Sequence, residues 1–158
     1  MAGKKRSRQH ERVREKPAPE YAPSQVQSAL NGVLLDSDVV IEVLRGRKRV
    51  IEALTRLEQR GVPTFCTAIT WAEVHAGLRR GEEQLTEEFF QARGEVVIDA
   101  RAGRRAGTYL AHFRRTHGVE LADALIGAAA STSGLSLWTL NRKHYPMKDV
   151  LHWDPAGE

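Results

Sequence analysis

Cysteine is nearly absent from this sequence, and long apolar runs are missing altogether. Cys66 is the single cysteine in 158 residues, which excludes an internal disulfide and a zinc site built from several thiolates. No apolar run approaches the roughly 20 residues that span a bilayer, and no apolar segment follows the charged N-terminus, so we expect neither a membrane span nor a secretory signal. With 41% hydrophobic and 28% charged residues, the composition predicts a soluble, cytoplasmic, globular protein.

Positive charge is in excess, but it is concentrated at one end of the chain. Residues 1–30 contain seven of the 24 basic and three of the 20 acidic side chains, so residues 31–158 contain 17 of each and are neutral overall. Three prolines and no sustained apolar period predict that residues 1–30 are a disordered basic tail, followed by one domain over residues 31–154. The tail is either an arm that touches nucleic acid or a solvated extension. A neutral domain has to bind a polyanion through local charge clusters and metal.

Short apolar segments alternate with stretches of helical apolar spacing along the domain. We predict strands at 33–35, 64–67, 95–98 and 135–140, and a possible fifth at 150–153. Helices are predicted at 39–45, 50–60, 70–80, 82–93, 100–117 and 121–133. Strands that alternate with helices form a parallel sheet covered on both faces. The sequence therefore predicts a three-layer α/β/α fold around four to five parallel strands, with ligands at their carboxyl ends.

An acid follows the first predicted strand, at the edge where such sheets bind ligands. Val33-Leu34-Leu35 runs into Asp36, and Asp38 comes two residues later. The next helix needs only one of these acids as its N-cap. Asp38 is the better placed for capping, which leaves Asp36 free for chemistry. A metal-binding role for Asp38 stays open beside capping.

Two further acids come at helix starts that face the same edge. Glu73 belongs to Thr70-x-x-Glu73, which is also typical of a capping box, in which the glutamate bonds back to the cap residue. Asp123 lies in the first turn of an apolar helix, where the helix dipole favours an acid. If buried, it needs a cation or hydrogen bonds. Carboxylates gathered at one edge repel one another without a cation and offer the oxygen ligands that suit Mg²⁺ or Mn²⁺.

Four segments around these side chains follow one another in order: Leu34-Leu35-Asp36-Ser37-Asp38-Val39-Val40-Ile41-Glu42, Thr67-Ala68-Ile69-Thr70-Trp71-Ala72-Glu73, Leu121-Ala122-Asp123-Ala124-Leu125-Ile126 and Trp138-Thr139-Leu140-Asn141. Together they resemble the PIN-domain family, and within it the VapC-type toxins of toxin–antitoxin pairs. The resemblance covers about residues 33–153. Each segment is a weak indicator alone, whereas four in the family's order are fairly specific.

The resemblance implies a role for each matching position. Asp36, Glu73, Asp123 and Asn141 become the predicted catalytic residues, and Asn141 occupies the family's fourth acidic position. The predicted metal ligands are Asp36, Glu73 and Asp123, with Asp38 as a further carboxylate. Thr139 is expected to orient a ligand or a water. An asparagine at the fourth position argues against a tightly held second metal.

The implied activity is hydrolysis of RNA phosphodiester bonds with Mg²⁺ or Mn²⁺, by a toxin that inhibits translation. The implied partners are an RNA substrate, a cognate antitoxin and a second copy of the chain in a homodimer. No histidine base is required, so we expect His75, His112, His117 and His144 to be surface or packing residues. Phosphates are expected to be held by basic residues near the active edge, namely Arg45, Arg47, Lys48, Arg49, Arg142 and Lys143.

Three other functions fit the same residues. A housekeeping PIN-domain nuclease of RNA processing is the nearest. A haloacid-dehalogenase-type phosphatase would use Asp36 as nucleophile and Asp38 as acid and base, but no acid pair follows the last predicted strand. An idle PIN-like module that binds RNA or protein is a third, and the retained acids argue against it.

Overall fold

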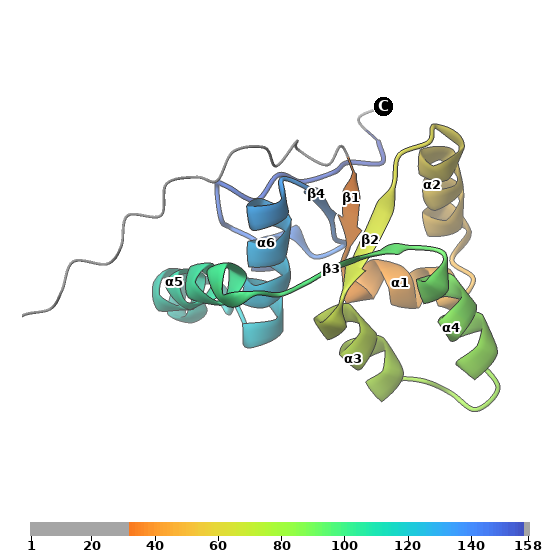
Figure 1. Cartoon of the computed structure of the whole chain (residues 1–158), viewed down its shortest axis with the longest axis horizontal. Coiled ribbons are helices and arrows are strands. Elements are labelled where there is room, and N and C mark those ends of the chain that lie inside the picture. The colour runs from red at the N-terminus through yellow and green to blue at the C-terminus, as the bar shows by residue number, and fades with distance from the viewer. Residues whose placement is uncertain (1–31, 157–158) are drawn as a thin grey trace, which may run out of the picture.

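The computed structural model describes residues 32–156 and consists of alternating strands and helices (Figure 1). The predicted basic tail lies outside the described residues. The elements are, in chain order, β1 (Val33–Leu35), α1 (Ser37–Leu44), α2 (Lys48–Gln59), β2 (Thr64–Thr67), α3 (Ala68–Ala76), α4 (Glu83–Gln91), β3 (Gly94–Val96), α5 (Ala100–His117), α6 (Leu121–Ser133), β4 (Ser136–Trp138) and a short 3₁₀ helix, η1 (Arg142–His144).

The strands form one parallel, four-stranded sheet in the order β3-β2-β1-β4. Alternate side chains of the central strand β1 enter two different cores. Leu34 packs with residues of α5 and α6, whereas Val33 and Leu35 pack with residues of α1, α2, α3 and α4. Both faces of the sheet are therefore covered, which is the usual condition of a parallel sheet. The predicted three-layer α/β/α fold is confirmed.

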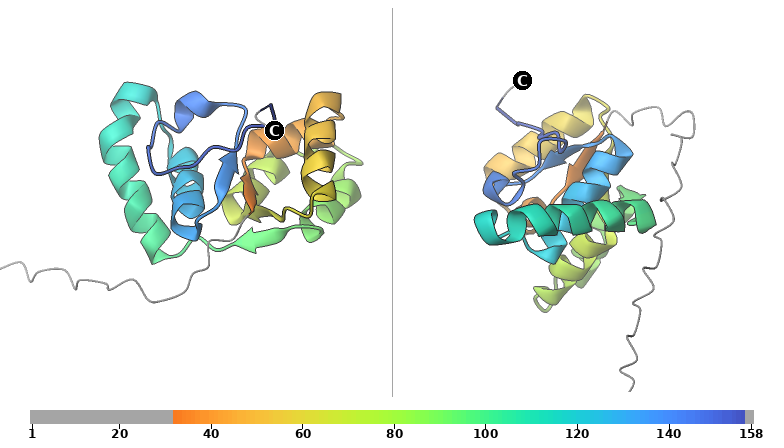
Figure 2. Two further views of the ribbon diagram at one scale, coloured as in Figure 1. Left: turned by 90° about the horizontal axis from the view of Figure 1, so that it is seen from above. Right: turned by 90° about the vertical axis from the view of Figure 1, so that its left-hand side faces the viewer.

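The long helices α5 and α6 end where the sequence predicts. Gly118 and Gly134 follow their last turns with positive φ angles of 65° and 68°, a conformation that glycine adopts without strain. Ala128, Ala129 and Ala130 of α6 are fully buried, and these small side chains let α5 pack closely along α6 (Figure 2). No helix within residues 32–156 is long and apolar enough to cross a membrane.

Two predicted strands are shorter than expected, and the possible fifth strand is wrong. The segment 150–153 contributes only an isolated bridge between Leu137 and His152. The strand predicted at 135–140 ends at Trp138, because the backbone N–H of Leu140 donates to the Asp38 carboxylate instead of continuing the ladder. The strand predicted at 95–98 is observed at 94–96.

The capping box considered for Thr70 with Glu73 is not observed. Thr67 is the N-cap of α3: its hydroxyl accepts from the Thr70 N–H, and the Thr70 hydroxyl accepts from the Thr67 N–H. The helix starts two residues earlier than expected and ends at Ala76. Glu73 therefore lies in the second turn and is not needed for capping.

Candidate active site

Asp36 occupies the carboxyl end of β1, where it is also the N-cap of α1. The residue is 6% exposed. One oxygen, Oδ1, accepts from the Ser37 N–H at 2.8 Å, and the other, Oδ2, accepts from the Tyr145 hydroxyl at 2.9 Å. Burial raises the pKa of Asp36, although hydrogen bonds from Thr139, Tyr145 and the Ser37 N–H oppose the shift. The hydrogen bonds thus favour the ionised carboxylate, the form in which it can bind a cation.

Asp38 does not cap α1, so that prediction is wrong. It lies in the first turn, and its Oδ2 accepts from the Leu140 N–H at 3.0 Å and from the Thr139 hydroxyl at 3.3 Å. Its other oxygen, Oδ1, is buried and has no hydrogen-bond partner within residues 32–156. Burial, and next the charge of Asp36, raise the pKa of Asp38 to about 6. A buried, unpartnered carboxylate oxygen is costly unless a proton or a cation satisfies it.

Asp123 lies in the first turn of α6, as predicted, and its Oδ2 accepts from the Glu120 N–H at 2.8 Å. The same oxygen is 3.5 Å from Nδ1 of His144. The Asp123 charge contributes to the raised pKa of Asp36, as the Asp36 charge does for Asp38. The fold therefore brings Asp36 at the end of β1, Asp38 in α1 and Asp123 in α6 near enough for their charges to interact, and we call these three residues the acid cluster.

Glu73 is not part of this cluster in its present side-chain conformation. It is half-buried on α3, a helix that packs against both α1 and α6, but its charge is not among those that raise the pKa of Asp36 or Asp38. In the part of the chain that the structure describes, no three Asp, Glu, His or Cys side chains are close enough together to hold one metal ion as they stand. A ligand role for Glu73 stays a prediction.

Asn141 follows β4 at the same edge of the sheet. Its backbone N–H donates to the Thr139 hydroxyl at 3.0 Å, and its carbonyl accepts from the His144 N–H at 3.1 Å. Thr139 thus links Asn141 to Asp38 through one hydroxyl group. A catalytic role for the Asn141 carboxamide stays a prediction.

Sequence reasoning assigned no role to Tyr145, which the structure places beside Asp36. Its side chain is 3% exposed, and its hydroxyl donates to Asp36. Burial, together with the nearby carboxylates, raises the pKa of this phenol, so it stays a hydrogen-bond donor. Gly127 of α6 leaves room for the ring: a Cβ there would sit 3.3 Å from the tyrosine Cδ1. His152 packs against the other side of the site, edge-on to the ring.

The four histidines are surface or packing residues, as predicted, but one of them packs beside the acid cluster. His75, His112 and His117 are exposed helix residues, as expected. His144, by contrast, is beside Asp123, so it belongs to the border of the acid cluster. Nothing in the local sequence pattern distinguishes it from the other three, because its position depends on how the segment after β4 folds back over α6.

The acid cluster is chemically suited to a divalent cation. It offers only hard carboxylate oxygens and includes the unpartnered Oδ1 of Asp38. The charge of Asp123 raises the pKa of Asp36, and the charge of Asp36 raises the pKa of Asp38. Mg²⁺ and Mn²⁺ prefer such ligands, and their charge offsets the mutual repulsion of the acids. The donor set therefore fits the metal that the resemblance implies.

Comparisons with known proteins agree with this fold and site. Residues 33–149 match the sequence model of the PIN domain. The chain is 34% identical over 125 residues to ribonuclease VapC10 of Mycobacterium tuberculosis, covering 75% of this chain and 90% of that protein. It is 29% identical over 115 residues to ribonuclease VapC19 of the same organism, covering 72% and 92%.

Solved structures show the same fold. A toxin–antitoxin complex from Klebsiella pneumoniae contains a chain with a TM-score of 0.63 and 26% identity, and DNA-bound VapBC from Salmonella typhimurium gives 0.67 and 19%. Each alignment covers 78% of this chain and 98% of the other. An α/β/α domain with acids at the carboxyl edge of its sheet is the architecture of a PIN nuclease, and the chain belongs to the PIN-domain family. Its curated relatives within that family are VapC ribonucleases. The phosphatase alternative is thereby removed.

Proposed function

We propose that this protein is a divalent-metal-dependent ribonuclease that acts in the cytoplasm as the toxin of a toxin–antitoxin pair. The observation that carries the proposal is the acid cluster, in which Asp36 after β1, Asp38 in α1 and Asp123 in α6 lie near one another at the carboxyl edge of a PIN-type sheet. The relatives named as ribonucleases support the reaction, and the toxin–antitoxin complexes among the structural neighbours support the biological role.

The chain's own residues would hold the metal and orient its ligands. Asp36 and Asp123 would contribute carboxylate oxygens, with Asp38 and Glu73 as further ligands. The Ser37 N–H donates to one oxygen of the Asp36 carboxylate and the Tyr145 hydroxyl donates to the other, so the orientation of the carboxylate is fixed. A bound Mg²⁺ or Mn²⁺ would supply a more acidic water and stabilise charge on the phosphodiester. Thr139, which donates to Asp38 and accepts from the Asn141 N–H, holds the end of β4 next to the metal ligands.

Two macromolecular partners follow from the proposed role. We infer that an antitoxin encoded with the protein covers the acid cluster and blocks it, and that the active toxin is a homodimer. The neighbours described as toxin–antitoxin and VapBC complexes support the antitoxin. Light scattering of the purified chain, alone and with the product of the adjacent gene, measures both assemblies.

The decisive experiment is a cleavage assay on partner-free protein. Total prokaryotic RNA is incubated with the full chain in Mg²⁺, in Mn²⁺ and in EDTA, beside Asp36→Asn and Asp123→Asn. The matched control is Asp99→Asn, which makes the same change at the exposed N-cap of α5, a position where asparagine also caps well. We expect discrete fragments that require metal and both acids and that the control still produces.

Folded protein that cuts no RNA in either metal contradicts the nuclease. Cleavage without arrest of growth on induced expression contradicts the toxin and favours a housekeeping nuclease. Calorimetric titration of Mn²⁺ into the wild type and Asp123→Asn tests the metal site without relying on activity, and equal binding by both would exclude Asp123 as a ligand.

A further inference from the structure

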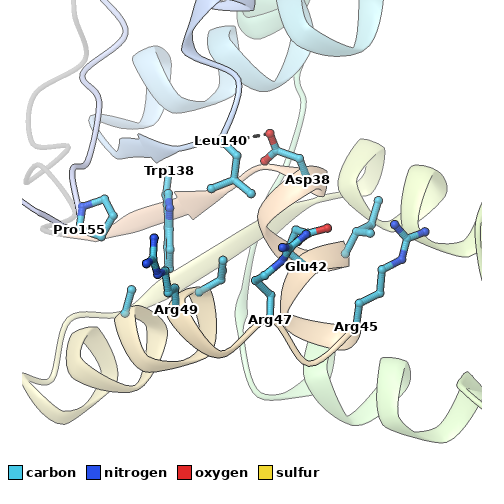
Figure 3. A pocket seen from close by; sticks show the side chains of 11 residues that line it. Asp38, Glu42, Arg45, Arg47, Arg49, Trp138, Leu140 and Pro155 are labelled. Carbon is cyan, nitrogen blue, oxygen red and sulfur yellow. Dashed lines mark hydrogen bonds and ion pairs between the residues drawn. The ribbon is translucent and has the colours of Figure 1, made fainter.

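A pocket of about 720 Å³ opens beside the acid cluster, between α1, α2 and the end of β4 (Figure 3). This volume is in the range of pockets that hold a small molecule or one unit of a polymer. Asp38 is part of its wall, and Leu140, which donates its backbone N–H to Asp38, is another part. The pocket and the acid cluster therefore share the side chain of Asp38. A ligand bound over the acids consequently lies next to the pocket.

The lining of the pocket is partly apolar and partly basic. Its apolar residues are Ile41, Val50, Ala53, Trp138, Leu140 and Pro155. Leu140 is 50% exposed, which is unusual for a large apolar side chain and leaves it available for contact. Figure 3 shows three arginines along one side of the pocket, opposite Asp38 and Leu140.

Two of the three arginines are available for an anion. Arg47 is paired with Glu42, so both of those charges are already neutralised. Arg45 and Arg49 are exposed, and neither makes an ion pair within residues 32–156. They flank the start of α2, which has no acid in its first turn and no side-chain cap, so the helix dipole adds positive potential at the same place. Guanidinium groups bind phosphate oxygens through two parallel hydrogen bonds.

We propose that this pocket is a substrate subsite that holds one unstacked nucleotide of single-stranded RNA next to the scissile phosphate. In this arrangement the base lies against Leu140 and the other apolar residues of the lining, and the flanking phosphates bind Arg45 and Arg49. This assignment rests on the proposed ribonuclease function. Proteins that read RNA commonly take unstacked bases into such apolar surfaces and hold phosphates with arginine. An acidic peptide would also pair with the arginines. RNA is favoured because a strand cleaved at the acid cluster extends beyond it, over the adjoining surface that contains the pocket.

The test is RNA binding in EDTA, where a metal-dependent nuclease leaves the probe intact. Short fluorescein-labelled single-stranded RNAs of uridine, cytidine or adenosine are titrated with the full chain at several salt concentrations. The Arg45→Ala/Arg49→Ala double variant is compared with Arg114→Ala/Arg115→Ala, which removes the same two charges from the exposed end of α5. Loss of two phosphate contacts lowers the slope of log affinity against log salt by about 1.4, at about 0.7 per phosphate on a single strand. The control slope should stay as in the wild type.

A second measurement tests the base contact. An RNA with one abasic position should bind the wild type more weakly than the intact strand, and this difference should shrink in Leu140→Ala, which removes part of the wall. The subsite is overturned if the two arginine double variants have equal RNA affinities and equal salt slopes. It is also overturned if the loss of affinity for the abasic RNA is the same in Leu140→Ala as in the wild type. Retained RNA binding in Arg45→Ala/Arg49→Ala, together with lost binding of the antitoxin, would assign the pocket to the protein partner instead.

Failure of the subsite is distinguishable from failure of the proposed function. If the wild type cuts RNA with metal but both double variants bind alike, the nuclease stands and the subsite is wrong. If the wild type neither binds nor cuts RNA, the ribonuclease proposal itself fails.

Discussion

Tyr145→Phe removes a single oxygen from the candidate site and isolates the hydrogen bond to Asp36. The ring is 3% exposed and packs against Gly127 and His152, so phenylalanine keeps the packing. The hydroxyl donates to Oδ2 of Asp36 at 2.9 Å in a buried setting. A hydrogen bond to a charged group contributes about 1.5–3 kcal/mol, and loss of a group that orients a metal ligand lowers metal affinity or activity by about 10–100-fold.

We therefore expect Tyr145→Phe to raise the Mn²⁺ concentration for half-maximal cleavage by about tenfold or more, with little change in the KM for RNA. Direct Mn²⁺ binding, followed by electron paramagnetic resonance, should weaken by a similar factor. Tyr109→Phe is the matched control. Its hydroxyl also donates to an aspartate, Asp149, at 2.6 Å, but this pair lies between α5 and the C-terminal segment. It should lower the melting temperature and leave the metal dependence unchanged.

Three results would refute this reasoning. Unchanged Mn²⁺ affinity in Tyr145→Phe would mean that the Ser37 N–H and the metal are enough to orient Asp36. Tighter Mn²⁺ binding would mean that the hydroxyl competes with the metal for Oδ2. Equal losses of metal affinity in Tyr145→Phe and Tyr109→Phe would show a general effect on stability, without a specific role at the acid cluster.

Three further variants test other parts of the site. Because the folded-state pKa of Asp38 is raised from 3.8 to about 6, metal-free protein should lose stability as pH rises from about 4 to 6. Asp38→Asn should weaken that loss and raise the free energy of unfolding at neutral pH by about 1–2 kcal/mol after allowance for partial exposure. An unchanged pH profile of stability in denaturant titrations would contradict the raised pKa of Asp38. Gly127→Ala should displace the Tyr145 ring by a few tenths of an ångström and cost about 1–3 kcal/mol, seen as a lower melting temperature together with reduced cleavage. Glu73→Gln should reduce cleavage at limiting Mn²⁺ while leaving the melting temperature of metal-free protein close to that of the wild type, since Glu73 has no capping role; full activity at every metal concentration would remove it from the ligand set.

Local patterns in the sequence predicted the fold well because parallel α/β domains depend on local features. The apolar run 33–35, the glycines after α5 and α6, and the alternation of strands with helices are each set by residues close in sequence. Errors arose where a hydrogen bond to a side chain decided the boundary of an element. The Leu140 N–H bonds to Asp38 from 102 positions away, so β4 ends early. Thr67 and Thr70 cap each other, so α3 begins before its expected start.

The layered fold could be predicted from apolar periodicity, and the family from four short motifs in a fixed order. The same motifs predicted that Asp36 follows β1 and that Asp123 lies in the first turn of α6, where the structure has them. The groups that surround those acids could be identified only from the folded chain. Tyr145 reaches Asp36 across 109 positions, and His144 reaches Asp123 because the chain folds back over α6 after β4. The unpartnered oxygen of Asp38 likewise exists only because the fold buries it. Such contacts depend on distance and burial between remote segments, and no local pattern of residue types specifies either quantity.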